Sequence, residues 1–144
     1  MIFTETALKG ACIIEPEFME DMRGGFARIF CEKQFQDYGL ISNFPQCSIS
    51  TNEKKGTLRG MHFQTKPHEE TKLVRCTMGA LYDVIIDLCP NSLTFKKWEA
   101  FELSAENRKT LYIPSGFAHG YQTLEDNTEV FYQISGFYAP DSTR

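Results

Sequence analysis

Several features that would mark a nucleic-acid-binding, membrane or secreted protein are missing from this chain of 144 residues. It has no excess of basic residues: the formal net charge is −4, so the surface as a whole favours neither nucleic acid nor an acidic membrane. Asp83 and Asp87 interrupt the longest apolar stretches, which leaves no segment long enough to span a bilayer. The first residues lack the basic and then apolar pattern of a secretion signal. We therefore expect a cytoplasmic protein with neither nucleic acid nor a membrane as its partner.

The cysteines lack the spacing of the usual zinc and redox motifs. The chain has five cysteines, an odd number, with no C-x-x-C pair. Most of them lie in apolar runs typical of strands, where a free thiol acts as a small hydrophobic side chain. We expect reduced cysteines in the core at Cys12, Cys31, Cys47, Cys76 and Cys89.

Helical patterns are nearly absent, and strand patterns dominate. Short runs rich in Val, Ile, Phe, Tyr and Thr are separated by Gly, Pro and Asn. Because strands do not alternate with helices, the chain is predicted to be an all-β jelly-roll sandwich, a single domain over residues 1–144. One short helix is expected at Glu32–Tyr38, closed by Gly39. Strands are expected at Cys12–Glu15, Phe26–Phe30, Gln46–Thr51, Thr57–Phe63, Lys72–Met78, Leu81–Asp87, Trp98–Leu103, Thr110–Ile113, His119–Thr123 and Glu129–Phe137.

A double-sheet jelly roll leaves a pocket between its sheets, open at one end. Residues 78–80, Met-Gly-Ala, predict a tight hairpin between two of the strands. Aromatic positions in residues 25–30 and 131–138 are suited to covering a partner subunit, so we expect a homodimer.

The run Gly56–Gln64 is the first candidate for chemistry, because it holds an arginine and a histidine between glycines. In a regular strand Arg59 would face away from His62. The two side chains can share a site only if Gly60 marks a bulge or if the strand ends there, and the sequence does not decide between these cases. Lys72 opens the next strand, and the three together could take a proton from an anionic substrate. A lone histidine in a strand is more often structural, so both interpretations stay open.

Two aspartates share one face of the predicted strand Leu81–Asp87. A buried carboxylate is unfavourable unless it is paired or hydrogen-bonded. Asp87, at the strand end, is interpreted as a turn residue. Asp83, in mid-strand, is either structural or orients a histidine or a lysine.

A second motif, P-x-G-x-x-H, ends at His119. Together with the glycine-to-histidine run ending at His62, it resembles the two motifs of cupins, small β-barrels of the jelly-roll type. Metal-binding cupins carry His-x-His in the first motif, whereas Gln64 stands at the second histidine position here. Only three histidines occur in the chain, and a transition metal prefers three or four nitrogen or carboxylate ligands. We expect neither a metal nor another cofactor.

Two further positions are expected to be structural on the residues alone. Tyr132 shares a strand face with Val130 and Ile134, which is typical of a core tyrosine. Arg23 lies in a polar glycine turn and is expected to be an exposed hairpin arginine.

A set of segments spread over nearly the whole chain carries a closer resemblance. These are Asp-x-Arg-Gly-x-Phe at 21–26, Gly-x-Leu-Arg-Gly-Met-His-Phe-Gln at 56–64, Lys-Leu-Val-Arg at 72–75, Asp-Val-x-x-Asp at 83–87, Leu-Ser-Ala-Glu-Asn at 103–107 and Ile-Pro-x-Gly-Phe-Ala-His-Gly at 113–120. In this order they resemble the dTDP-4-dehydrorhamnose 3,5-epimerase family. The resemblance implies a metal-free dimeric jelly roll that acts on a nucleotide-linked 4-keto-6-deoxy sugar.

The resemblance also implies residue roles. His62 matches the family's general base and Tyr132 the acid on the opposite face of the sugar. Lys72 matches the cation beside the C4 carbonyl, with His119 and Asp83 behind it. Substrate-binding positions, the arginines among them holding the diphosphate and nucleotide, are implied at Arg23, Phe26, Gln46, Ser48, Arg59 and Tyr138.

These residue types suit the chemistry. Hydrogens on carbons that flank a ketone are acidic because the resulting anion delocalises onto oxygen. A neutral histidine can take such a proton near physiological pH. An ammonium group stabilises the charge that develops on the enolate oxygen. Inversion requires a proton from the other face, which a tyrosine hydroxyl can donate, and arginine's planar fork suits a diphosphate.

The chain departs from the family pattern at some positions. Arg28 stands where a glutamate is common, Ser48 where an asparagine is usual, and Thr143 where an acidic residue precedes the terminal arginine. Family members also continue past Arg144 with an aspartate that pairs with the base histidine. Two alternatives therefore remain: a nucleotide-sugar 3,4-ketoisomerase, which typically has the His-x-His pair, and a non-catalytic sugar-nucleotide-binding cupin.

Overall fold

Two antiparallel sheets form the body of the protein in a computed structural model that describes all of residues 1–144. The larger sheet has the strand order β1-β2-β10-β7-β12-β5, and the smaller has the order β6-β11-β8-β9. The elements are β1 (Ile2–Glu5), β2 (Cys12–Glu15), β3 (Met19–Asp21), β4 (Gly24–Phe26), α1 (Glu32–Asp37), β5 (Gln46–Asn52), β6 (Leu58–His62), β7 (Lys72–Met78), β8 (Ala80–Asp87), β9 (Trp98–Ser104), β10 (Thr110–Ile113), β11 (Phe117–Thr123), β12 (Thr128–Ile134) and the 3₁₀ turn Pro140–Ser142.

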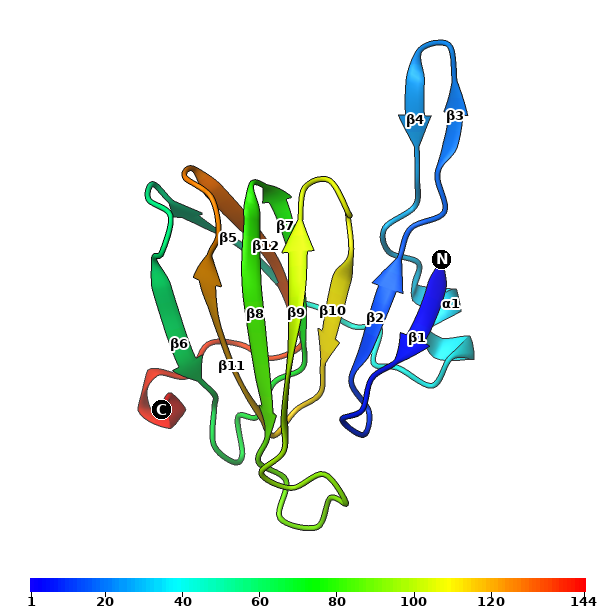
Figure 1. The fold of residues 1–144 in the computed structure, drawn as a ribbon. Coiled ribbons are helices and arrows are strands. Elements are labelled where there is room, and N and C mark those ends of the chain that lie inside the picture. Colours follow the sequence, from blue (N-terminus) through cyan, green and yellow to red (C-terminus); the bar gives the residue numbers. More distant parts are fainter.

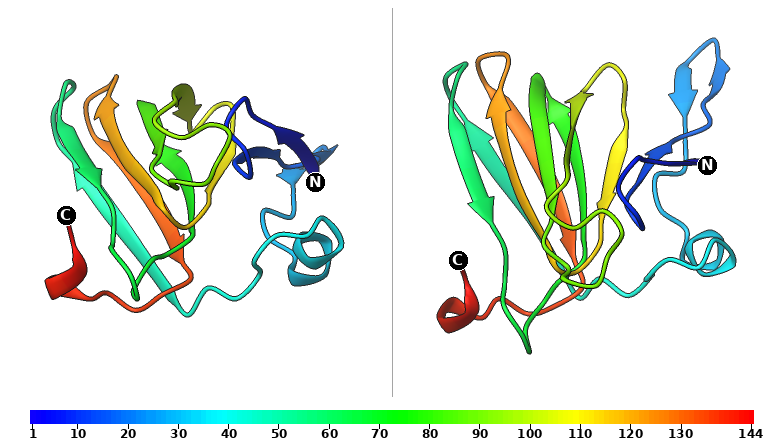
Figure 2. Two further views of the ribbon diagram at one scale, coloured as in Figure 1. Left: turned by 90° about the horizontal axis from the view of Figure 1, so that it is seen from below. Right: turned by 60° about the horizontal axis from the view of Figure 1, so that its bottom comes forward.

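The two sheets face one another, as the view from below shows (Figure 2). Their inward side chains form the main core: Val74 and Val130 come from the larger sheet, and Leu81 and Ile85 from the smaller. All four are completely buried. This alternation of inward apolar and outward residues, repeated along antiparallel strands, is what the predicted jelly-roll sandwich requires. The apolar core fills the space between the sheets except at the open end of the sandwich, where a pocket can form.

A second apolar cluster covers part of the outer face of the larger sheet. Phe35 of α1 is completely buried against Leu73 and Tyr112, and the partly buried Phe30 and Phe44 pack around it. The phenyl rings of Phe30 and Phe35 have their centroids 4.9 Å apart. The single helix is thus held by packing against β2, β7 and β10.

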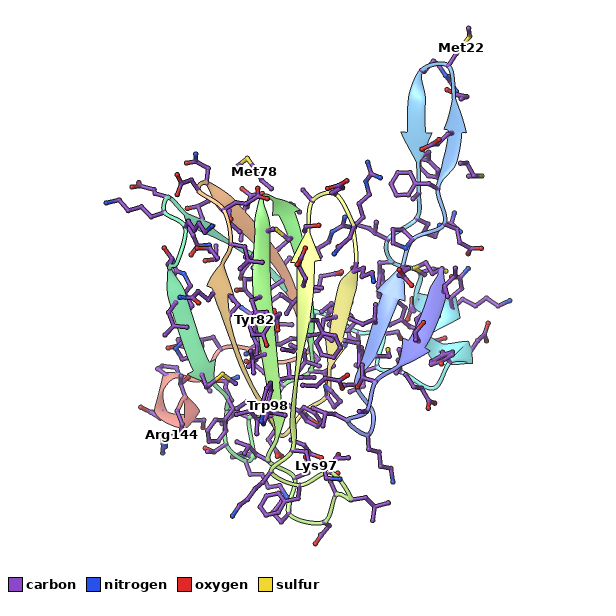
Figure 3. The ribbon with its side chains drawn as sticks, in the orientation of Figure 1. Met22, Met78, Tyr82, Lys97, Trp98 and Arg144 are labelled. Atoms are coloured by element: carbon purple, nitrogen blue, oxygen red, sulfur yellow. The ribbon has the colours of Figure 1, made fainter.

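A two-stranded arm, β3–β4, extends away from the sheets (Figure 1). Met22 lies at its tip and is fully exposed (Figure 3). Met19 and Phe26 are exposed over 67% and 62% of their surfaces. Such large apolar side chains on an isolated hairpin have no core to cover them in this chain.

Most predicted strands are confirmed, and the helix ends as expected, with Gly39 at a φ of +78° after the helix C-cap. The strand predicted at Phe26–Phe30 is wrong, because only the hairpin strand Gly24–Phe26 forms. Past Phe26 the chain leaves the hairpin and has no strand beside it, and Phe30 packs on the helix instead. Strands β1 and β3 were not predicted, and β12 ends at Ile134 rather than at Phe137.

The expectation of five core cysteines is confirmed only in part. All five are free, and Cys12 and Cys76 are buried, whereas Cys31 and Cys89 are half-buried. Cys47 is exposed because β5 is an edge strand whose outer face has no covering layer.

No helix of the structure has the length and apolarity that crossing a membrane requires.

Candidate active site

A cavity of about 280 Å³ opens between the two sheets. The smaller sheet contributes His62 and Arg59 from β6 and His119 from β11, and the larger contributes Lys72 from β7 and Tyr132 from β12. The full lining is Ser48, Ser50, Arg59, His62, Lys72, His119, Gly120, Tyr121, Tyr132 and Ile134. Every catalytic position implied by the sequence except the buried Asp83 lines this cavity.

A bulge in β6 brings Arg59 and His62 to the same face. In the pairing of β6 with β11, His62 lies opposite His119 and Arg59 opposite Tyr121. Three steps on β6 therefore match two steps on β11, so two side chains that regular alternation would separate share one face. Gly60, at a φ of +100°, lies within the bulge. The sequence left open whether Arg59 and His62 share a face, and of the two ways in which they can, the structure shows the bulge.

Gly60→Ala is expected to destabilise the protein more than an ordinary glycine substitution at positive φ. An added Cβ would lie 2.6 Å from the Cα of Gly120 and 2.7 Å from the carbonyl oxygen of His119, and these backbone atoms cannot easily move. Gly56→Ala is the control, because its φ is +82° but nothing lies within 4 Å of its Cβ. Urea unfolding should show a loss of roughly 1–2 kcal/mol for the control. A larger loss is expected for Gly60→Ala, and equal losses would contradict the close packing of β6 on β11.

His119 forms a buried pair with Asp83. The two residues are joined by a hydrogen bond of 2.9 Å between Nε2 of His119 and Oδ2 of Asp83. Burial raises the pKa of the Asp83 carboxyl above its usual value, although His119 and Lys72 oppose this shift. The other carboxylate oxygen has no hydrogen-bond partner. Two interpretations of Asp83 were left open, a structural residue or one that orients a histidine or binds a lysine, and the contact with His119 fits the second. Asp87 lies at the end of its strand, as expected, and accepts from the backbone N–H of Cys89.

Tyr132 is half-buried and faces the histidines across the cavity. Its ring centroid is 6.4 Å from that of His119. Burial, followed by the neighbouring Tyr121, raises the pKa of the Tyr132 hydroxyl well above its usual value. The hydroxyl is therefore protonated at neutral pH and can act as a proton donor.

Hydrogen bonds between the sheets fix the Arg59 side of the cavity. Nε of Arg59 donates to Oδ1 of Asn52 over 2.8 Å, and Nδ2 of Asn52 donates to the Tyr121 hydroxyl over 3.3 Å. The Tyr121 hydroxyl also lies 3.1 Å from Oγ of Ser50. Sequence reasoning missed Tyr121, Asn52 and Ser50, although the alternation that selects His119 also selects Tyr121 two residues later.

A second cavity, of about 290 Å³, adjoins the first, since His62 and Lys72 line both. Tyr138 borders it, and the backbone N–H of Tyr138 donates to Oε1 of Gln46 over 2.9 Å. Glu70 also lines it, with Oε1 lying 2.9 Å from Nζ of Lys72. Glu70 was not among the residues predicted for the site, though its spacing of two residues from Lys72 is that of side chains on one strand face.

Arg23 and Phe26 lie on the β3–β4 arm and do not line either cavity. Arg23 is exposed and pairs with Asp21, also exposed, over 2.5 Å. No three side chains among His, Cys, Asp and Glu lie close enough together to hold a metal ion. Gln64, at the second histidine position of metal-binding cupins, is buried and donates to Glu70.

Two facing antiparallel sheets with a polar cavity at their open end make this protein a cupin-type jelly roll. The family model for dTDP-4-dehydrorhamnose 3,5-epimerase matches residues 5–144. The chain belongs to this family and is an isomerase that epimerises a nucleotide-linked 4-keto sugar.

Individual relatives agree over nearly the whole chain. The dTDP-4-dehydrorhamnose 3,5-epimerase of Methanothermobacter thermautotrophicus is 44% identical over 139 residues, which cover 96% of this chain and 74% of the relative. The crystal structure of the Elizabethkingia anophelis enzyme is 42% identical with a TM-score of 0.96, covering 99% of this chain and 78% of the other. A Legionella pneumophila 3,5-epimerase, solved in complex with dTDP-4-keto-L-rhamnose, is 34% identical with a TM-score of 0.91 and covers 99% and 75%.

Proposed function

We propose that this enzyme inverts both C3 and C5 of a dTDP-linked 4-keto-6-deoxy sugar. One observation carries the proposal: His62 and Tyr132 reach a shared cavity from opposite sheets. A base and an acid on opposite sides of a bound ring are what inversion of a carbon centre needs. The sugar would lie between the sheets, with one face toward β6 and the other toward β12.

In the proposed reaction His62 accepts the proton from the carbon beside the C4 ketone. The electron pair of the broken C–H bond forms a double bond to C4, and the carbonyl π electrons move onto the oxygen, which becomes an enolate. Lys72 stabilises that oxygen with its ammonium group, since electrostatic help matters most where charge develops. Tyr132 then donates its proton to the opposite face of the carbon, and both residues return to their starting states by exchange with water. Repeating the sequence at the second carbon inverts both centres.

His119 has a supporting role in this proposal. Its ring is held by the buried Asp83, which keeps the imidazole in one tautomer and orientation. From β11 it lies directly opposite His62 in the strand pairing. The fixed His119–Asp83 pair therefore limits the positions that the C4 oxygen and the ammonium group of Lys72 can take in the cavity.

For nucleotide binding we propose Arg59, Ser48, Gln46 and Tyr138 around the mouths of the two cavities. Arg59 is exposed, and two of the five N–H donors of its guanidinium are in use: Nε donates to Asn52, and one terminal nitrogen donates to the carbonyl oxygen of Thr51 over 3.4 Å. The remaining donors suit a diphosphate. The five free cysteines support a reducing compartment, so we place the enzyme in the cytoplasm.

Thermal-shift measurements with free nucleotides test the ligand directly. At a hundredfold excess over its dissociation constant, dTDP should stabilise the protein by about 2.7 kcal/mol. For a domain of this size that corresponds to roughly 5–10 °C. GDP, CDP and UDP at the same concentration should give smaller shifts, and Arg59→Ala should reduce the dTDP shift. A larger shift with GDP or CDP than with dTDP would contradict the proposed nucleotide.

We further propose that the enzyme is a homodimer in which the β3–β4 arm of one copy completes the cavity of the other. The support is the arm's exposed apolar surface and its projection away from its own sheets (Figure 1). This would bring Arg23 and Phe26 to a bound nucleotide, as the sequence resemblance implies.

Mixed dimers of two weakly active variants test whether the β3–β4 arm serves the partner's cavity. Chains with Arg23→Ala and chains with His62→Ala, each weakly active alone, are unfolded together and refolded so that mixed dimers form. If the arm serves the partner, one cavity of each mixed dimer has both His62 and an intact arm, and activity returns. If the arm serves its own chain, every cavity has one defect, and the absence of recovery would contradict the exchange.

A further inference from the structure

Glu70 is a nearly buried carboxylate at the edge of the site, on the segment that enters β7. Its side chain is 10% exposed and that of Lys72 15%. The neighbouring backbone is fixed by reciprocal contacts, since the N–H of Thr71 donates to Oγ of Ser135 and the N–H of Ser135 donates to the carbonyl of Thr71. Glu70 is therefore held in place, not free to swing into solvent.

Each oxygen of the Glu70 carboxylate has its own donor. Oε1 accepts from the ammonium group of Lys72 over 2.9 Å, and Oε2 accepts from Nε2 of Gln64 over 2.6 Å. Oε1 of Gln64 in turn accepts from the backbone N–H of Ala139 over 2.8 Å. Because that backbone group can only donate, it fixes the Gln64 amide with its NH₂ group toward Glu70. Because Lys72 and Gln64 both donate, position 70 needs a side chain with an acceptor at each of its two terminal atoms, as a carboxylate has.

This chain of contacts joins Lys72 to the C-terminal segment. Residues 139–144 lie beside the end of β6 (Figure 1), where Phe63 and Arg144 exchange backbone hydrogen bonds of 3.0 and 2.9 Å. Gln64 also forms a β-bridge with Thr143. The orientation of Glu70 is therefore set by well-anchored backbone on both sides.

We propose that Glu70, held by Gln64, is a positioning residue that aims the Lys72 ammonium at the C4 oxygen of the substrate. One of the three N–H donors of Lys72 goes to Glu70, which leaves two for the cavity that Lys72 lines. Without the carboxylate the long lysine side chain loses its fixed direction. This inference rests on the proposed function, in which Lys72 stabilises the enolate.

Glu70→Gln is the first variant, because it keeps the size of the side chain but puts an NH₂ group against that of Gln64 or against the ammonium. The expected loss is about tenfold in kcat, which equals about 1.4 kcal/mol of transition-state stabilisation, with KM changed less than about twofold. Gln64→Glu alone sets two carboxylates against each other and should also lower kcat. The double variant Gln64→Glu with Glu70→Gln restores a donor facing an acceptor at every contact.

The double variant is therefore expected to recover most of the kcat lost by either single variant, a coupling that independent sites do not show. Thermal unfolding of all four proteins corrects for any loss of folded enzyme. A kcat of Glu70→Gln equal to that of the parent would overturn the assignment, as would a loss that the double variant does not restore. A parent enzyme that fails to exchange substrate hydrogens overturns the proposed function itself, which is a separate outcome.

Discussion

His62→Ala should lower the exchange of substrate hydrogens with heavy water by about 10²–10⁴-fold at both C3 and C5. Positioned general bases contribute rate factors of this size. Exchange at both carbons should depend on His62, because its imidazole is exposed on the edge strand β6 and lines the cavity. The other imidazole of the cavity, that of His119, is hydrogen-bonded to the buried Asp83. Since His62 is exposed, the free energy of unfolding should change by no more than about 0.5 kcal/mol.

His68→Ala is the matched control for this variant. His68 is also exposed but lines neither cavity of the site, so its removal should leave exchange unchanged. NMR of the substrate recovered from heavy water measures deuterium at each carbon for both variants. Exchange by His62→Ala at the parent rate would show that another group is the base.

Tyr132→Phe should separate exchange from inversion. Without its hydroxyl the cavity loses the acid on the face opposite His62, so formation of the inverted product should fall by about 10²–10⁴-fold. His62 can still remove a proton and return a deuteron to the same face, so deuterium should enter substrate whose configuration is unchanged. The phenol is protonated at neutral pH, as any donor must be, and burial raises its pKa further.

Tyr82→Phe provides the comparison, because Tyr82 lies on the outer face of the smaller sheet (Figure 3) and is 44% exposed. It should form product at the parent rate. The measurement follows deuterium incorporation and product configuration in the same sample by NMR. Undiminished inversion by Tyr132→Phe, or an equal loss of exchange and inversion, would contradict the separate roles of base and acid.

Most of the strands and the helix followed from local patterns, because alternation and turn residues are written in consecutive positions. The hairpin predicted at residues 78–80 is wrong, because the chain passes there from β7 in the larger sheet to β8 in the smaller one. The shared face of Arg59 and His62 did not follow in the same way. A period of two places them on opposite faces, and only the pairing of β6 with β11 shows the extra residue at Gly60. The sequence marked the place with a glycine but left the register open.

The other site residues that the sequence did not predict depend on long-range contacts. Glu70, Gln64 and Ala139 meet because the C-terminal segment returns to β6, a contact between positions about seventy residues apart that periodicity cannot reveal. Tyr121 and Asn52 likewise meet across the two sheets. The strand expected at Phe26–Phe30 failed for a related reason: apolar residues predict burial, but whether they pair in a sheet depends on what lies beside them.

The family resemblance supplied what the residues alone left open. Considered by itself, Tyr132 was interpreted as a core tyrosine, and it does pack against the main core while also lining the cavity. Arg23 was expected to be an exposed hairpin arginine, and in this chain it is one. In the proposed dimer, Arg23 reaches a bound nucleotide from a second copy of the chain.

The central claim is that one cavity inverts two carbons through enolates, and hydrogen exchange by the parent enzyme tests it most directly. A dTDP-linked 4-keto-6-deoxy sugar is incubated with the enzyme in heavy water, and the product is examined by NMR. Deuterium is expected at both C3 and C5, with the configuration of both carbons inverted and the ketone still at C4. No deuterium at either carbon, or a ketone moved to C3, would contradict it.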